Sequence, residues 1–156
     1  MTRGAITAAN AIALWREPYV LAAAADHLVA TRDRWSVKDL AETPFILRAA
    51  CEAHDDGQRA FAAEGLRPRA VLRSADEERC AAAVLAGLGV SLMPRSLLRP
   101  GLATTEIREV VLERRVMLGW RTGTDGELLG VLRETALAHA WPGRSGARDS
   151  HLDFAR

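Results

Sequence analysis

The chain has 156 residues, 49% of them hydrophobic and 26% charged, which is enough apolar material for a core and excludes a disordered protein. Its formal net charge of +1 gives no basic excess of the kind that marks a nucleic-acid-binding surface. No apolar run approaches the length of a membrane span, and two cysteines do not make a disulfide framework. We therefore expect a cytoplasmic chain with one domain's worth of residues.

The first third of the chain predicts two strands separated by turns. In chain order, we expect a helix or loose arm over residues 1–14, a strand over 19–24, a short turn over 27–30 and a buried strand over 45–47. A signal peptide is disfavoured, because the N-terminal apolar stretch is short and is broken by Thr7 and Asn10. Ser36 and Asp39 have the spacing of a capping box, which predicts a short helix before the second strand.

The middle of the chain predicts a strand, a helix and a second, parallel strand. In chain order, we expect a loop over residues 49–56 and an amphipathic helix over 58–64. A strand over 71–72, an Ala-rich helix over 80–86 and a second strand over 90–93 follow. Ser74 and Glu77 have the spacing of a second capping box at the start of the Ala-rich helix, and Gly87 ends that helix. A strand, helix and strand in this order form a βαβ crossover, the unit of a parallel sheet covered by helices.

The last third predicts two further strands and a helix. We expect a turn over residues 99–101, strands over 103–110 and 116–120, and a helix over 128–140. Thr124 and Glu127 have the spacing of a third capping box. One face of the helix is formed by Leu128, Val131, Leu132, Thr135 and Ala136. The remaining residues are rich in Gly, Ser and Arg, which predicts a disordered tail.

Four segments resemble the effector-binding domain of LysR-type transcriptional regulators. The first is SADEERCAAAVLAGLGVSLMPRSLL, in which a strand end with a serine and an acid precedes a helix closing in GLGV-x-L-x-P. The others are EPYVL with DHL, VKDLAETPFI and RRVMLGWR. The resemblance implies an α/β fold of the periplasmic-binding-protein-like type II, with a doubly wound, mostly parallel sheet. It covers the second subdomain plus a C-terminal return.

The resemblance also implies a domain organisation. Residues 1–14 would be an arm, 15–140 a partial effector-binding domain and 141–156 a disordered tail. The family's winged helix-turn-helix, its linker helix and the first half of its effector domain have no counterpart in this sequence. We therefore expect no direct DNA binding by this chain and no membrane contact. We expect a homodimer, because uncovered strand edges and apolar faces favour self-association, and because the family's effector domains pair side by side.

The implied function is that of a non-enzymatic module that senses a small-molecule effector, without a cofactor or metal. In α/β sheets, ligands bind beyond the carboxyl ends of strands, next to helix N-termini. At such strand ends, the candidate effector-binding residues are Arg48, Ala49, Cys51, Ser74, Ala75 and Asp76. Arg48 would supply a bidentate donor for a carboxylate effector, or would be a solvated loop charge. Ser74 would add a donor unless it is used as a helix cap.

Other functions have weaker support in the sequence. Residues 82–91 mimic the first helix and turn of a helix-turn-helix, but residues 92–99 offer almost no polar side chains for base edges. Cys51 and His54 have a spacing that can ligate a metal, but no second ligand pair exists, which favours a polar loop. The remaining alternatives are a free-standing small-molecule carrier of the periplasmic-binding type and a small α/β enzyme that uses Cys51 or Asp76.

Overall fold

The computed structural model describes residues 10–141. The arm expected over residues 1–9 and the tail expected over residues 142–156 lie outside the described residues. The chain divides into two compact units, a terminal unit (Met1–Glu17 with Arg115–Arg156) and a central unit (Pro18–Arg114). Within residues 10–141, no helix combines the length and the apolar character that a membrane crossing requires.

The central unit is built on strands of a mixed sheet and on a two-stranded parallel sheet, which one parallel bridge joins. Its strands are β1 (Ala11–Ala24, which begins in the terminal unit), β2 (Arg34–Trp35), β3 (Pro44–Arg48), β4 (Arg69–Ser74), β5 (Ser91–Pro94) and β6 (Leu102–Ile107). β3 pairs in parallel with β4, β2 pairs in parallel with β6, and Phe45 forms a parallel bridge with Val90. β1 runs antiparallel to both β5 and β6. The predicted α/β class is therefore confirmed.

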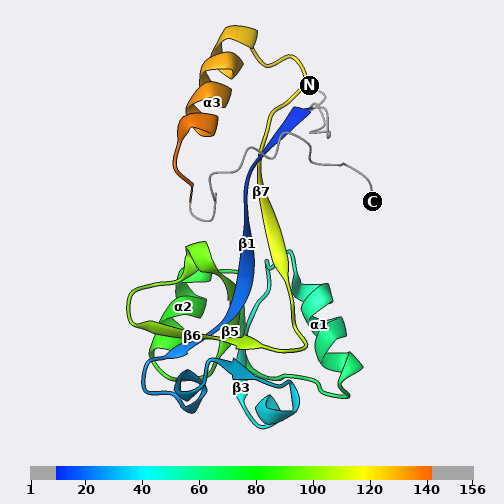
Figure 1. Cartoon of the computed structure of the whole chain (residues 1–156), viewed down its shortest axis with the longest axis vertical. Helices are drawn as coiled ribbons and strands as arrows, with labels where there is room; N and C mark the ends of the chain where they lie inside the picture. The colour runs from blue at the N-terminus through cyan, green and yellow to red at the C-terminus, as the bar shows by residue number, and fades with distance from the viewer. Residues whose placement is uncertain (1–9, 142–156) are drawn as a thin grey trace. The chain divides into compact units, whose positions relative to one another are not determined.

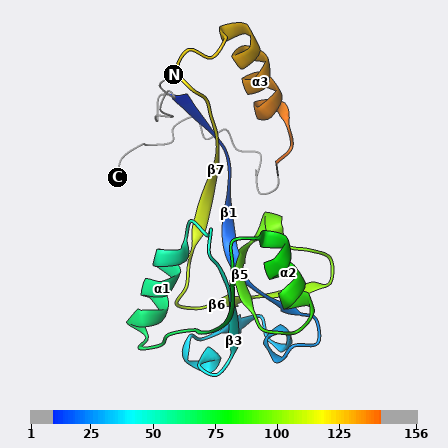
Figure 2. The ribbon, with the colours of Figure 1, turned by 180° about the vertical axis from the view of Figure 1, so that it is seen from behind.

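Helices α1 (His54–Ala63) and α2 (Glu77–Leu85) lie on opposite sides of this sheet (Figures 1 and 2). Successive residues of a strand point to opposite faces, so β3 supplies side chains to both helices. Phe45 meets Phe61 of α1 edge to face, with ring centroids 5.4 Å apart. Ile46 belongs instead to the cluster that contains Cys80 and Val84 of α2. Both cores therefore depend on this one buried strand.

The predicted crossover is present as β4, α2 and β5, with β3 between the two strands. Gly87 ends α2 with a φ of 74°, a conformation that residues with a side chain rarely adopt. Gly89 is needed for a different reason, because a Cβ at this position would overlap the carbonyl oxygen of Pro44. The next residue, Val90, donates its N–H to the same oxygen at 2.9 Å. The close approach of the chain after α2 to β3 thus requires a glycine.

The turn region after β1 follows the prediction closely. Residues Leu28–Thr31 form a 3₁₀ turn, and the buried Trp35 donates from its Nε1 to the carbonyl oxygen of Val29 at 2.9 Å. The first capping box is confirmed, because Ser36 N–H donates to Asp39 Oδ2 and Asp39 N–H donates to Ser36 Oγ. The helix that it starts is a single 3₁₀ turn, Lys38–Leu40.

Two predicted boundaries were wrong. Residues 11–14, expected in the arm, belong to β1, because the first half of this strand has a partner in β7 (Glu113–Gly119) that lies far away in sequence. α1 begins at His54, inside the predicted loop, and carries Asp55 and Asp56 in its first turn. Negative side chains at this end of a helix are favoured by the macrodipole, which stabilises the earlier start.

The terminal unit contains the first half of β1, most of β7 and helix α3 (Gly126–Ala138). Trp120 donates its backbone N–H to the carbonyl oxygen of Asn10 at 2.9 Å. The rings of Trp15 and Trp141 stack with centroids 4.8 Å apart. Arg133 of α3 lies over the Trp120 ring at 5.3 Å. Aromatic contacts therefore hold α3 within this unit.

Helix α3 confirms the predicted helix, but its predicted apolar face is not covered by the described residues. Leu128 and Val131 expose 56% and 58% of their surface, and Leu132 and Thr135 are also exposed. Ala136 is half-buried, and no residue of α3 is fully buried. An amphipathic helix normally turns such a face toward a partner.

Candidate functional site

The parallel pairing of β3 and β4 brings the candidate residues to one edge of the sheet. Arg48 and Ser74 are register partners at the carboxyl ends of the two strands. Ala49 N–H donates to the carbonyl oxygen of Ser74 at 2.8 Å, which extends the pairing by one residue. Cys51 follows Ala49, and Ala75 and Asp76 follow Ser74. The topology predicted from the sequence thus places these segments side by side, and we call them the strand-end edge.

The guanidinium fork of Arg48 binds Glu77, an arrangement that neither expectation for this residue included. Its Nε and Nη2 donate to the two carboxylate oxygens of Glu77 at 2.6 and 2.8 Å. The Arg48 side chain is only 3% exposed, so it is not a solvated loop charge either. Burial opposes the charge, but the hydrogen bonds and charge of Glu77, with Cys51 beside it, raise the pKa of Arg48 above its ordinary value. Arg48 therefore remains charged and tied to α2.

The expected capping box at Ser74 and Glu77 is wrong, and Asp76 caps α2 instead. Asp76 Oδ1 accepts from the N–H of Arg79 at 3.1 Å. Ser74 Oγ accepts from the N–H of Asp76 at 3.1 Å, so the serine shapes the turn before the helix. The Glu77 carboxylate is committed to Arg48 and does not reach back to Ser74. An aspartate serves as well as a serine at the N-cap, which explains the shift by two residues.

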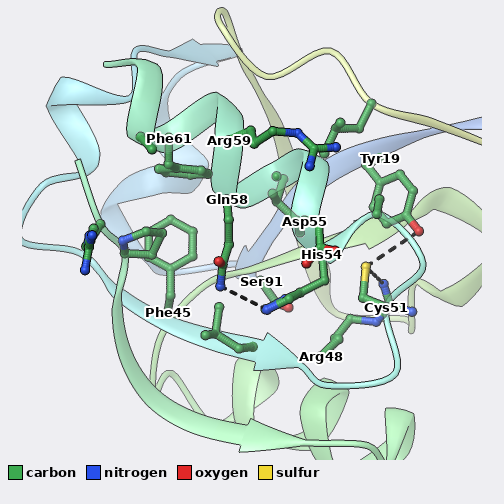
Figure 3. A pocket seen from close by; sticks show the side chains of 18 of the residues that line it. Tyr19, Phe45, Arg48, Cys51, His54, Asp55, Gln58, Arg59, Phe61 and Ser91 are labelled. Carbon is green, nitrogen blue, oxygen red and sulfur yellow. Dashed lines mark hydrogen bonds between the residues drawn. The ribbon is translucent and has the colours of Figure 1, made fainter. Parts of the chain in front are cut away.

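Cys51 lies between Arg48 and Tyr19 at the same edge (Figure 3). Its Sγ accepts from Arg48 Nη1 at 3.5 Å and donates to the Tyr19 hydroxyl oxygen at 3.7 Å. Burial raises the pKa of Tyr19 far above its ordinary value, and hydrogen bonds with Cys51 and Glu52 add to the effect. The Tyr19 hydroxyl is therefore neutral over the physiological pH range and adds no negative charge to this end of the site.

A cavity of about 630 Å³ lies beneath α1, and Arg48 and Cys51 line one part of it (Figure 3). The other four candidates, Ala49, Ser74, Ala75 and Asp76, do not line it. Its size is typical of a small-molecule site. The sequence did not single out Tyr19, Gln58, Arg59, Phe61 and Arg67, which also line it. The only available signal was the amphipathic helix itself, whose partner strand was not known in advance.

The structure gives no support to the metal or DNA-binding alternatives. Among residues 10–141, no group of three potential ligands has the geometry to hold a metal ion. His54 lies at the start of α1, with its Nε2 2.9 Å from Gln58 Nε2. Residues Ser91–Pro94, the start of the supposed recognition helix, form strand β5 and therefore cannot enter a DNA groove as a helix.

A family model matches most of the chain, and several solved structures share its fold. The family model described as the LysR substrate binding domain matches residues 3–141. The regulatory domain of CcmR from Synechocystis PCC6803, solved in complex with 2-PG, is 21% identical with a TM-score of 0.69, and the match covers 83% of this chain and 65% of that chain. The C-terminal domain of a probable LysR family transcriptional regulator from Rhodococcus sp. RHA1 is 24% identical with a TM-score of 0.68, and the match covers 82% and 67%.

The effector binding domain of QuiR in complex with shikimate gives a similar match, at 18% identity and a TM-score of 0.65, over 84% of this chain and 66% of that chain. The chain thus spans about two thirds of the length of these structures. No curated protein matches the sequence. The structural likeness shows the type II periplasmic-binding-protein-like fold that the sequence predicted.

Proposed function

Because this chain belongs to the LysR substrate binding domain family, we propose that it is a small-molecule effector-sensing module of a LysR-type transcriptional regulator. The observation that carries the proposal is the strand-end edge, where the register of Arg48 with Ser74 gathers two chain segments at the carboxyl ends of parallel strands. Ligands of open α/β sheets bind at such ends. Two structures of the same fold support a small-molecule ligand, since one was solved with 2-PG and another with shikimate.

Within this proposal the candidate residues have different roles. Arg48 is a buried support, because Glu77 binds its guanidinium fork. The effector would contact the neighbouring residues of the strand-end edge. Ala49, Ala75 and Asp76 are exposed at the edge, and Cys51 is half-buried beside them. A small carboxylate is the effector class that we propose, with the thiol of Cys51 and the turn at Ser74 as its polar neighbours. An effector that binds one conformation more tightly would shift the population toward it.

We also propose that the chain is not an enzyme, that it acts in the cytoplasm and that it does not bind DNA directly. A free-standing small-molecule carrier is the second candidate function, and it predicts the same ligand contacts without a regulatory partner. Self-association as a homodimer is supported by the exposed apolar face of α3, with Leu128, Val131 and Leu132 uncovered by the described residues. Apolar patches of this kind commonly mark interaction surfaces.

A thermal-shift screen of small carboxylates and phosphates, including shikimate and 2-PG, tests the proposed function. We expect at least one compound to stabilise the chain, because a ligand that binds only the folded state raises its apparent stability. The Ala49→Trp variant should lose that stabilisation, since it places a large ring at the exposed edge. Ala82→Trp, at an exposed position of α2 that lines no cavity, is the matched control and should keep it. A hit that both variants retain, or no hit at all, would contradict the proposal.

A further inference from the structure

We propose that the cavity beneath α1 is a second ligand site, built for an elongated amphipathic monoanion whose charged head binds at Arg67. The inference rests on the proposed function only in that the module takes up small ligands. The cavity meets the strand-end edge at Arg48 and Cys51, but the proposed head-binding residue, Arg67, lies at the cavity's other end, and the ligand chemistry is narrower.

The cavity extends along β3, from the carboxyl end of this strand toward its amino end. Arg48 and Cys51 line it at the carboxyl end of the strand, whereas Phe45, Arg67 and Pro68 line it at the amino end, where Pro44 pairs with Arg69. Four of the five residues of β3, residues 45–48, line the cavity, and they span about 10 Å at the usual rise per residue of a strand. An extended ligand of about that length can therefore contact both ends of the cavity.

The middle of the cavity is apolar. Its wall contains Phe45, Phe61, Leu66, Leu92 and Leu112, and Figure 3 shows Phe45 and Phe61 together on the side away from Cys51. Gly57 of α1 faces the same space, and a Cβ there would lie 3.7 Å from Leu112 Cδ1 and 3.8 Å from Leu92 Cδ1. A wall of aliphatic and aromatic groups favours a hydrocarbon chain, which gains free energy for each methylene removed from water.

Two of the three arginines that line the cavity are ion-paired within the protein. Arg48 is paired with Glu77, and Arg59 is paired with Asp56. Arg67 has no ion pair or hydrogen bond from its side chain to any residue in the described part of the chain. Asp55, in the first turn at the opposite end of α1, is negative, and the helix N-terminus stabilises that charge. A ligand anion is thus attracted to the Arg67 end and repelled at the Asp55 end.

Beside Asp55, the far end of the cavity offers polar groups that are hydrogen-bonded to one another. The Tyr19 hydroxyl and the Cys51 thiol bond to each other, and His54 bonds to Gln58. A ligand tail that reaches this end meets hydrogen-bonded groups, an arginine already paired with Glu77 and the negative Asp55, so a second anionic group is disfavoured there. Together, the three parts of the cavity favour a ligand with one anionic head, an apolar body and an uncharged tail.

Isothermal titration calorimetry of the whole chain with octanoate tests the inference, with octanamide and octylamine as the neutral and cationic probes of the same length. We expect octanoate to bind more tightly than both, and affinity to rise about fourfold for each methylene from butanoate to octanoate. Arg67→Gln should weaken octanoate binding about tenfold and leave octanamide unchanged, because it removes a charge-assisted donor. Arg69→Gln, at an exposed arginine that does not line the cavity, is the matched control and should change neither.

A second pair of variants separates filling of the cavity from loss of charge. Ala62 lines the cavity and is exposed, so Ala62→Trp should abolish binding of both octanoate and octanamide. Its neighbour Ala63 is exposed but does not line the cavity, so Ala63→Trp should bind as the unmodified chain does. Failure of octanoate to bind, or binding that Arg67→Gln and Ala62→Trp leave unchanged, overturns the inference. Because Ala49 lies outside the cavity, a metabolite lost only in Ala49→Trp would still support the strand-end edge.

Discussion

Glu77 holds the guanidinium of Arg48 at two points, and so joins the last residue of β3 to the first residue of α2. The two residues are 29 positions apart, and the Arg48 side chain is almost fully buried. A buried cation of this kind is tolerated only with a partner, because the loss of water must be offset by hydrogen bonds. The pair therefore fixes how α2 meets the sheet at the strand-end edge.

Removal of Glu77 alone should be costly. We expect Glu77→Ala to lower the free energy of unfolding by about 2–3 kcal/mol, less than a fully buried pair would lose, because the Glu77 side chain is 34% exposed. The double variant Arg48→Met with Glu77→Leu should recover most of that loss, since no charge is left unpaired. Urea unfolding of the two variants and the unmodified chain measures this. A double variant less stable than Glu77→Ala would show that the pair does more than neutralise Arg48.

Tyr19 should make the chain less stable in alkali. Burial, together with Cys51 and Glu52, raises the pKa of Tyr19 well above its ordinary value of 10.0. Above pH 10 the unfolded chain releases this proton and the folded chain keeps it, so the free energy of unfolding falls by up to about 1.4 kcal/mol per pH unit. Tyr19→Phe should flatten this slope between pH 10 and 11. Burial also raises the pKa of Cys80, so the Tyr19→Phe variant should keep a residual fall in stability that begins at lower pH.

The two α-helices that carry aspartate caps provide a test of cap assignment. Asp76 caps α2, and Asp125 caps α3 by accepting from the N–H of Leu128 at 2.9 Å. We expect Asp76→Ala to cost about 1 kcal/mol, as loss of an N-cap usually does. Ser74→Ala should cost less, because the Ser74 hydroxyl accepts from the N–H of Asp76, in the turn before the helix, and does not cap α2. Thermal unfolding of both variants decides the matter, and an equal or larger cost for Ser74→Ala would favour the box predicted from sequence.

Two glycines should respond to alanine in opposite directions. Gly89→Ala would press a methyl group against the Pro44 carbonyl, so we expect a loss of about 1–3 kcal/mol in the free energy of unfolding. Gly57 lies inside α1, where an added methyl group would meet its neighbours at ordinary contact distances. Gly57→Ala should therefore gain about 0.5–1 kcal/mol from helix propensity. Chemical denaturation of the pair makes each variant the control for the other.

The exposed face of α3 should govern self-association. We expect the chain to exceed its monomer mass of 16.9 kDa in light scattering at micromolar concentration, because Val131 and Leu132 present apolar surface. Val131→Glu with Leu132→Glu should return it to the monomer, since two charges would be buried on association. Glu127→Gln with Glu134→Gln, two exposed positions of the same helix, is the control and should not dissociate it. A monomer for the unmodified chain would refute the homodimer.

The order of strands and helices in the central unit could be predicted because it depends on local signals. Apolar runs, a glycine at 87 and a proline at 94 lie next to the elements that they limit. The first half of β1 could not be predicted, because its partner β7 is about a hundred residues away and the segment itself has no strong strand pattern. Capping was predicted correctly at Ser36 but was placed early at Ser74 and Thr124. In both wrong cases an aspartate lies closer to the helix.

The candidate site shows the same limit. Parallel pairing was enough to bring Arg48 and Ser74 to one edge, since that follows from the crossover alone. The partner of Arg48 could not be foreseen, because Glu77 had a plausible local role in a capping box and its actual role depends on packing. Arg67 lies between a leucine and a proline, just after a glycine, and looks like a surface charge in the sequence. Only the fold shows that it lies at the mouth of a cavity.

The distribution of tryptophans gives the two units separate optical signals. Of the chain's four tryptophans, Trp15, Trp120 and Trp141 belong to the terminal unit, and Trp35 belongs to the central unit. Trp35 is buried, donates from its indole to Val29 and has Arg32 over its ring at 4.5 Å, so its fluorescence should shift to longer wavelength when that unit unfolds. A chain with Trp35→Phe would report only the terminal unit. Subtracting its emission from that of the unmodified chain would show whether the two units melt together or one after the other.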